Sequence, residues 1–197
     1  LFFNTLKELA EEGGIPMERI DDAVRRILRV KFAMGLFEKD YTFAADRSLE
    51  GSFGSDEHRA VGRQSVRESM VVLKNEEATL PLSKSVSHIH VTGPGADDIG
   101  MQSGGWTIEW QGELGDVTEG TTVLEAIQAS VSAETVVTYS ADGTGGEDAD
   151  VIVLVVGEKP YAEFFGDDSN LVLDAPNQAA FNNAAASGKP MVTLLFS

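Results

Sequence analysis

The sequence contains no cysteine, no long apolar run and few basic side chains. The lack of cysteine excludes disulfides, thiolate zinc sites and a cysteine nucleophile. No run approaches the roughly 18 uninterrupted apolar residues of a membrane span, and the first residues lack the progression of a secretory signal. With 15 basic against 32 acidic residues, the net charge of −17 repels phosphate backbones and anionic lipid. We therefore expect neither nucleic acid nor a membrane surface as a partner.

Glycine motifs that bind phosphate and serine motifs that attack esters are also missing. There is no G-x-x-x-x-G-K-[ST] and no G-x-S-x-G. Gly93, Gly95 and Gly100 follow one apolar run, but the third glycine comes two positions too late for G-x-G-x-x-G. Pro94 also interrupts the turn. The spacing therefore argues against a dinucleotide site, and serine nucleophile chemistry is set aside.

Apolar residues make up 42% of the 197 residues, which is enough for a packed core. The length fits one domain, with room for a small appendage. The chain opens on Leu1 without an initiator methionine and stops directly after a predicted strand that should lead into another helix. We therefore expect a fragment of a longer polypeptide.

The first part of the chain is predicted to be helical. In residues 16–34, Pro16 suits a first turn and apolar residues recur every three or four positions, so this segment predicts a helix. Gly35 follows as a left-handed cap, and residues 38–54 form a polar linker. Ser55 begins a second helix that runs to about residue 70. Residues 70–73 are then apolar and β-branched, which is typical of a strand.

From residue 86 onward, short apolar runs alternate with helical segments. Runs that are apolar on both faces indicate buried parallel strands. The runs are residues 89–92, 136–139, 151–156 and 191–196. The helices between them cover about residues 123–130, with a capping box of Thr122 and Glu125, and about residues 177–186, behind Pro176. The alternation predicts the α/β class, as an α/β sandwich with a mostly parallel sheet.

Ligands of open parallel sheets bind beyond the carboxyl ends of the strands, so the loops there are the expected site. The loop after residues 89–92 contains Trp106 and Trp110, the only tryptophans, beside Gly104 and Gly105. An exposed indole next to flexible backbone suits stacking on a sugar ring. The alternative is that both indoles only cover the end of the sheet.

The loop after residues 151–156 is rich in carboxylates. They are Glu158, Glu163, Asp167 and Asp168. One of them becomes a general acid if burial or a neighbour raises its pKa, and the two phenylalanines that follow Glu163 would desolvate it. The alternative is that these acids form a solvated face.

The histidines give weak support for a metal site. His88 and His90 lie two apart on one strand face, His58 lies in a helix, and no third ligand accompanies them. We therefore expect each to be exposed or hydrogen-bonded. The acidic, glycine-rich residues 141–150 predict a solvated loop.

Four ordered blocks carry a resemblance to a known family. They are IPMERIDDAVRRILRVKFAMGLF, HRAVGRQSVRESMVVLKNEEATLPL, GPGADDIGMQSGGWTIEWQG and VVGEKPYAEFFGD. Together they closely resemble β-glucosidases and exo-β-glucanases of glycoside hydrolase family 3. The resemblance implies a (β/α)8-type barrel with an Asp nucleophile, followed by an α/β/α sandwich. Residues 1–37 would be the end of the barrel, 38–54 the interdomain linker, and 55–197 an incomplete sandwich, truncated at its C-terminus.

The resemblance also implies the role of two residues. Glu163 matches the acid/base of the family's YAE motif, and Trp106 matches the tryptophan that forms one wall of an aromatic clamp. The nucleophile, the second wall and the other sugar-binding residues belong to barrel segments outside this sequence. The implied activity is retaining, exo-acting hydrolysis of β-glucosides and β-glucans, which releases glucose from non-reducing ends and requires no metal or organic cofactor.

The implied partners are β-linked gluco-oligosaccharides and the chain's own barrel domain, and the implied location is periplasmic or secreted. We expect the isolated chain to be inactive, because it lacks the nucleophile. The alternative from another class is a non-catalytic α/β module that binds carbohydrate or a partner through the tryptophan loop. An enzyme needs Glu163, whereas a binding module does not.

Overall fold

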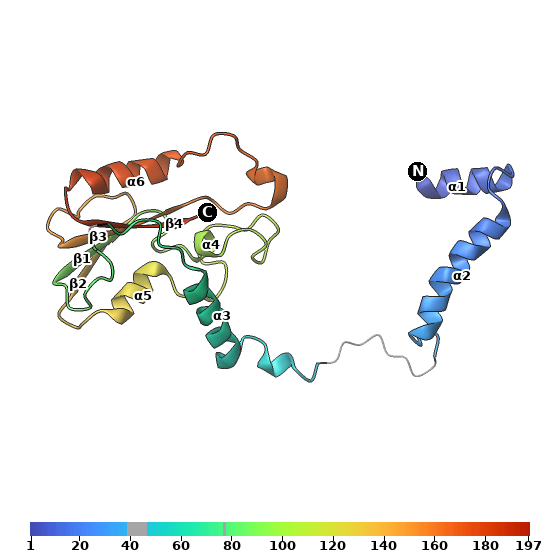
Figure 1. The fold of residues 1–197 in the computed structure, drawn as a ribbon, viewed down its shortest axis with the longest axis horizontal. Coiled ribbons are helices and arrows are strands. Elements are labelled where there is room, and N and C mark those ends of the chain that lie inside the picture. Colours follow the sequence, from blue (N-terminus) through green and yellow to red (C-terminus); the bar gives the residue numbers. More distant parts are fainter. Residues whose placement is uncertain (39–46, 77) are drawn as a thin grey trace. The chain divides into compact units, whose positions relative to one another are not determined.

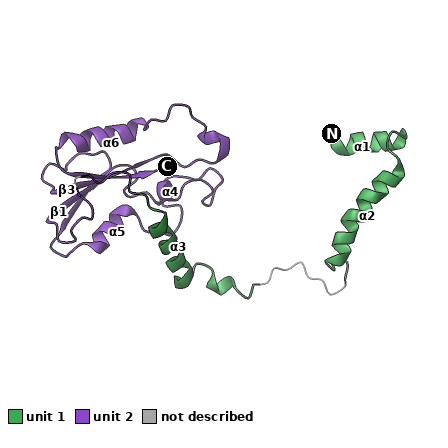
Figure 2. Cartoon of the chain, viewed as in Figure 1, with its two compact units in different colours: residues 1–71 green, residues 72–197 purple. Residues whose placement is uncertain are grey.

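The computed structural model describes residues 1–38, 47–76 and 78–197, and the chain divides into two compact units (Figures 1 and 2). Unit 1 comprises residues 1–71 and unit 2 residues 72–197. The domain limits expected from the sequence, at residues 37 and 54, stay a prediction. Among the described residues, no helix is both long and apolar enough to cross a membrane.

Unit 1 is helical, with α1 (Phe2–Glu11), α2 (Met17–Ala33), a 3-10 turn η1 (Glu50–Ser52) and α3 (Asp56–Ser69). The structure confirms both predicted helices and adds α1, which the sequence pattern did not predict. Gly35 has φ of 73°, as expected for the position after a helix, and the Ser55 hydroxyl accepts from the backbone N–H of His58. Residues 39–46 of the predicted linker lie outside the described residues.

The helices of unit 1 leave their apolar faces open to solvent. None of the residues of α1, α2 and α3 is buried. On α2, Val24, Ile27 and Phe32 are exposed by 47%, 60% and 60%. An apolar stripe of this kind normally packs against another element. These helices therefore do not form a core of their own.

The prediction of a strand at residues 70–73 is wrong. These residues are not in a strand and are exposed by 65% to 83%. An isolated apolar segment cannot satisfy its backbone groups as a strand without a pairing partner. Within the described residues, the sheet contains only strands from residue 88 onward.

Unit 2 contains a four-stranded sheet in the order β2-β1-β3-β4. The strands are β1 (His88–Thr92), β2 (Val136–Ser140), β3 (Val151–Gly157) and β4 (Met191–Phe196), and all neighbours pair in parallel. Every residue of β3 is buried, because it is a central strand covered on both faces. The four predicted strands are confirmed, with boundaries shifted by at most one residue.

Alternate side chains of β3 build two cores, one on each face of the sheet. Val151, Val153 and Val155 pack with Leu124 of α5 (Val123–Ser130), whereas Ile152, Leu154 and Val156 pack with Ala180 and Ala184 of α6 (Ala175–Ala186). Figure 1 shows α5 and α6 on opposite sides of the sheet. Both helices were predicted, and α5 begins with the expected capping box of Thr122 and Glu125. Unit 2 is thus an α/β sandwich.

Residues 141–150 do not form the fully solvated loop that their composition predicted. Gly143, Gly146 and Ala149 are buried, and a Cβ on Gly146 would lie 2.8 Å from Ile152 and 3.1 Å from His90. The missing side chains let the loop backbone lie directly on the sheet. The acidic side chains of the loop are exposed, whereas Gly146 lies against β1 and β3 and Gly143 lies against Ala180 of α6.

Candidate active site

The loop that follows β1 presents the tryptophans. It contains the short helix α4 (Ile99–Ser103), whose N-cap Asp98 accepts at 2.8 Å from the N–H groups of both Met101 and Gly115 and so closes the loop. The backbone N–H of Trp106 donates to the backbone carbonyl of Trp110 at 3.0 Å. Trp106 remains 69% exposed and Trp110 42% exposed. Trp106 therefore does not act as a simple cover for the sheet end.

The loop that follows β3 presents Glu163, which begins the 3-10 turn η2 (Glu163–Gly166). The side chain of Glu163 is exposed, as are Phe164 and Phe165, by 63% and 62%. The prediction that these rings desolvate Glu163 is therefore wrong for this chain, because Glu163 and both rings are exposed.

Backbone strain gathers in these two loops. Outside glycine, positive φ angles occur among the described residues at Trp106 (62°), Ile108 (62°), Glu163 (56°) and Ala78 (52°). A left-handed φ at a residue with a side chain costs of the order of 1–3 kcal/mol and persists where the surroundings enforce it. Three of these four residues, including both predicted site residues, lie in the loops at the carboxyl end of the sheet. Such clustering is typical of functional sites.

The two loops lie against each other. The Ala162 N–H donates to Oε1 of Gln111 at 3.0 Å, and a Cβ on Gly105 would lie 1.9 Å from the carbonyl oxygen of Tyr161. This approach requires glycine at position 105. The structure thus brings together the loops of Trp106 and Glu163, for which the strand pattern predicted only the same edge of the sheet.

Aromatic rings continue the contact between the loops. Trp110 lies edge-on to Phe165 and Phe164, with centroids 5.7 and 6.4 Å apart, and its centroid is 6.3 Å from that of Trp106. Phe164 and Phe165 stack at 4.6 Å. Such pairs each add about 0.5–1.5 kcal/mol beyond burial of area. The two tryptophans thus have different contacts: Trp110 packs on the Glu163 loop while Trp106 offers its face to solvent.

Two of the three remaining carboxylates of this loop, Glu158 and Asp168, have local partners. The Tyr161 hydroxyl donates to Oε2 of Glu158 at 3.0 Å, and this bond raises the pKa of Tyr161. The carboxylate of Asp168 accepts from the N–H of Asn170 at 2.8 Å, within a tight turn. Asp167 is exposed. The contact of Tyr161 with Glu158 had no signal in the sequence, because it depends on the fold of the loop.

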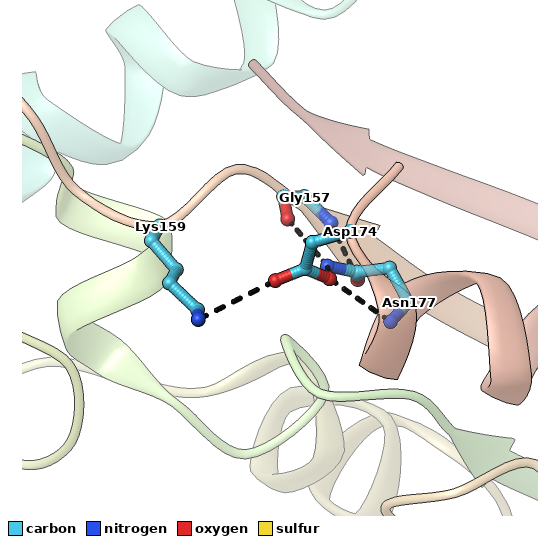
Figure 3. A network of polar contacts seen from close by, with 4 residues as sticks. All are labelled: Gly157, Lys159, Asp174 and Asn177. Carbon is cyan, nitrogen blue, oxygen red and sulfur yellow. Dashed lines mark hydrogen bonds and ion pairs between the residues drawn. The ribbon is translucent and has the colours of Figure 1, made fainter. Parts of the chain in front are cut away.

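The base of the Glu163 loop is fixed by a polar network (Figure 3). Asn177, 1% exposed, accepts from the N–H of Gly157 at 3.1 Å and donates to its carbonyl at 2.9 Å. Oδ1 of Asp174 caps α6 by accepting from the backbone N–H and the side-chain amide of Asn177. Its Oδ2 lies 3.6 Å from Nζ of Lys159. Partial burial opposes ionisation of Asp174, but the bonds from Asn177 and Lys159 outweigh it and hold its pKa below the ordinary value.

A cavity of about 280 Å³ lies beside the two loops and the end of β4. Gly105, Tyr161 and Phe196 are among its lining residues, whereas Trp106 and Glu163 do not line it. The two predicted site residues therefore stand on an open surface of unit 2. A closed pocket around them requires a second surface.

The histidines are hydrogen-bonded or exposed, as expected. His90 is 2% exposed, and its ring nitrogens contact the hydroxyls of Thr138 at 2.8 Å and Ser140 at 3.1 Å. His88 contacts the same Thr138 hydroxyl at 2.8 Å, and His58 is exposed. In the part of the chain that the structure describes, no three His, Cys, Asp or Glu side chains are grouped to hold a metal ion.

Comparison with known proteins finds relatives along the whole chain. The chain is 30% identical over 210 residues to a lysosomal beta glucosidase of Dictyostelium discoideum and 28% identical over 230 residues to a periplasmic beta-glucosidase of Salmonella typhimurium. These matches cover 96% and 98% of the chain but 26% and 29% of the relatives. The chain thus spans less than a third of the length of either relative.

Solved structures agree in fold. An exo-1,3/1,4-beta-glucanase from a Pseudoalteromonas species is 36% identical with a TM-score of 0.76, over 98% of this chain and 25% of that chain. A beta-glucosidase from Listeria innocua, solved in complex with glucose, is 29% identical with a TM-score of 0.72, over 96% of this chain and 26% of that chain. The profile of the glycosyl hydrolase family 3 C-terminal domain matches residues 70–197, so this chain belongs to glycoside hydrolase family 3.

Proposed function

We propose that the chain is the acid/base-bearing part of a retaining, exo-acting β-glucosidase or β-glucanase that releases glucose from non-reducing ends. Its similarity to β-glucosidases and to an exo-1,3/1,4-beta-glucanase supports hydrolysis of glycosides. The observation that carries the proposal is the placement of Glu163 and Trp106. Both are exposed, both have a left-handed backbone, and their loops are in contact.

Retaining hydrolysis requires two carboxyl groups about 5–5.5 Å apart. In the proposed mechanism, an Asp of the barrel attacks the anomeric carbon while Glu163 gives its proton to the leaving oxygen. Glu163 then takes a proton from water, which attacks the glycosyl intermediate and releases glucose. Because Glu163 is exposed in unit 2, we infer that the docked barrel supplies the remaining walls around its carboxyl group.

Trp106 is proposed to hold the leaving sugar. Its indole is 69% exposed and is fixed at the backbone by the bond from its N–H to the Trp110 carbonyl. A flat apolar face suits the C–H face of a sugar ring. Positioning of the leaving group beside Glu163 would favour proton transfer without any bond being made by the indole.

We further propose that residues 1–37 end the barrel and that the face with Trp106 and Glu163 docks on it. The exposed apolar side chains of α2 support the first part, since they lack a core within the described residues. The exposure of Trp106 and Glu163 supports docking of this face on the barrel. A periplasmic relative supports a periplasmic or secreted location for the whole enzyme.

The test uses the longer polypeptide that contains this chain, with Glu163→Ala. We expect kcat on aryl β-glucosides with poor leaving groups to fall by about 10²–10⁴, with a much smaller loss on activated leaving groups that need no proton. Azide should restore turnover and form the β-glycosyl azide. The measurement is steady-state kinetics on both substrates with product identification.

The matched control is Asp167→Ala, because Asp167 is an exposed carboxylate on the same loop. It should keep the activity and leaving-group dependence of the unaltered enzyme. If Asp167→Ala shows the loss and Glu163→Ala does not, the acid/base role belongs to Asp167. If neither variant changes hydrolysis, the acid/base role belongs to Glu158 or to a residue outside this chain, and in the latter case the non-catalytic binding module becomes the better account of these loops.

A further inference from the structure

Gln111 joins the two loops of the proposed site at the residue before Glu163. Its Oε1 accepts from the Ala162 N–H at 3.0 Å, across 51 positions of sequence. Ala162 is 4% exposed, so water does not replace this bond. We propose that Gln111 is a positioning residue, which holds the backbone that aims Glu163. This inference rests on the proposed function.

The backbone at Glu163 needs such support. Ala162 is extended, with φ of −135° and ψ of 143°, and the chain then turns into the left-handed region at Glu163, with φ of 56°. The turn η2 that starts there has no side-chain cap bond. Because a left-handed φ is unfavourable for glutamate, contacts from outside the turn must maintain it. The bond to Gln111 fixes the N-terminal side of this turn.

The amide oxygen of Gln111 makes a hydrogen bond, whereas its amide nitrogen does not. Nε2 is buried and has no hydrogen-bond partner among the described residues. If the amide of Gln111 were flipped, its NH2 group would face the Ala162 N–H, and two donors would oppose each other. Flipping the amide therefore does not remove the unpartnered donor. A buried donor without an acceptor lowers stability, so this atom does not explain the position of the side chain. The bond from the Ala162 N–H to Oε1 is thus the hydrogen bond that Gln111 provides.

Neighbours of Gln111 on both sides fix it to the same frame. Trp110 packs on Phe165, and a Cβ on Gly112 would lie 2.6 Å from the Gly104 carbonyl and 2.8 Å from Pro160. The Trp110 carbonyl in turn receives the Trp106 N–H. The sugar-facing indole and the proposed acid/base are therefore held by adjacent residues, which keeps their spacing constant.

The first test measures amide hydrogen exchange in this chain. Gln111→Ala should speed exchange of the Ala162 amide by about tenfold or more, because its acceptor is lost. Gln111→Glu keeps an acceptor oxygen and should retain the protection. The matched control is Gln102→Ala, since Oε1 of Gln102 accepts from the Val123 N–H at 3.0 Å. It should speed exchange at Val123 and not at Ala162. Unchanged protection of Ala162 in Gln111→Ala overturns the proposal.

The second test measures kinetics of the longer polypeptide. For Gln111→Ala we expect kcat to fall roughly tenfold on poor leaving groups and less than about twofold on activated ones, with KM little changed, because a misplaced acid slows proton transfer alone. General loosening of the fold would lower both rates equally, and Gln102→Ala should show no dependence on the leaving group. Equal losses on both substrates in Gln111→Ala overturn the proposal.

Glu163→Ala separates this inference from the proposed function. If Glu163→Ala shows the leaving-group dependence and Gln111→Ala does not, only the positioning role is lost. If Glu163→Ala itself shows no such dependence, the acid/base assignment fails and the positioning role fails with it.

Discussion

At the scale of single residues, His90 is a titratable side chain enclosed by the sheet and the loop of residues 141–150. Its ring contacts two hydroxyl groups of β2, and it is 2% exposed. Burial lowers the pKa of His90, and the neighbouring His88 lowers it further. The bond with the Thr144 backbone and the carboxylates of Glu147 and Asp142 act in the opposite direction. The net effect is a pKa of His90 below its ordinary value.

This residue makes stability depend on pH. Since the folded pKa of His90 is below the unfolded value of about 6.5, the unfolded chain binds a proton first as pH falls. The contribution of His90 is fully present above about pH 6.5 and is lost as pH falls below that value toward the folded pKa. We expect urea unfolding of the chain to give a free energy that decreases from about pH 7.5 to 5.5, and less steeply in His90→Asn.

The control is His58→Asn, because His58 is exposed on α3. Its unfolding free energy should follow the pH curve of the unaltered chain. Parallel curves for the unaltered chain and His90→Asn would show that another group causes the pH dependence.

At the scale of elements, the junction of β3 and α6 depends on Asn177. This side chain pairs with both backbone groups of Gly157, where the Glu163 loop begins, and with the cap residue Asp174. Asn177→Ala leaves the buried N–H and carbonyl of Gly157 without partners. We expect a loss of about 2–4 kcal/mol in the free energy of unfolding, measured by urea denaturation.

A second asparagine of α6 provides the comparison. Asn182 is exposed and its carbonyl only accepts from Gln178. Asn182→Ala should leave stability unchanged or raise it by about 0.5 kcal/mol, because alanine favours helix. Equal effects of the two substitutions would mean that helix propensity, and not the Gly157 contacts, determines the result.

The contact between the two site loops depends on Gly105. A Cβ at this position would lie 1.9 Å from the Tyr161 carbonyl oxygen and 2.6 Å from its carbon. Gly105→Ala therefore forces the loops apart, and we expect a loss of about 1–3 kcal/mol in the free energy of unfolding. The measurement is urea denaturation followed by tryptophan fluorescence, which reports on both indoles of the first loop.

Gly62 of α3 serves as the matched glycine, because nothing lies within 4 Å of its added Cβ. Gly62→Ala should stabilise its helix by about 0.5–1 kcal/mol. A stable Gly105→Ala variant with unchanged fluorescence would show that the loops accommodate the methyl group.

At the scale of the whole molecule, the proposed division of catalytic groups predicts an inactive chain. Glu163 lies in this sequence, whereas the proposed nucleophile lies in the barrel outside it. We expect the purified 197-residue chain to release no aryl alcohol from aryl β-glucosides above background.

The same chain with Glu163→Ala is the control for contaminating glycosidases, which would give equal rates in both samples. Turnover that is present in the unaltered chain and absent in Glu163→Ala would contradict the two-domain mechanism. In that case, the second carboxyl group would have to be sought within the 197 residues.

The strands, the sandwich class, α5 and α6 could all be predicted from the amino-acid sequence. Short apolar runs and capping residues act locally, so their effect can be predicted without knowledge of distant contacts. The residues that carry the family resemblance, including Glu163 and Trp106, can also be recognised in the sequence alone. The short helix α4 was not predicted, because it has only five residues, includes Gly100 and is followed directly by Gly104.

Which loops are in contact and which side chains are buried became visible only in the folded chain. The bond between Gln111 and Ala162 and the burial of His90 under residues 141–150 both join segments about 50 residues apart. The register of β1 with β2 and β3 sets the contacts of His90, since a shift by one residue would turn His90 to the opposite face. Strands that are apolar on both faces have no alternation to specify that register, whereas the packed sheet allows one arrangement.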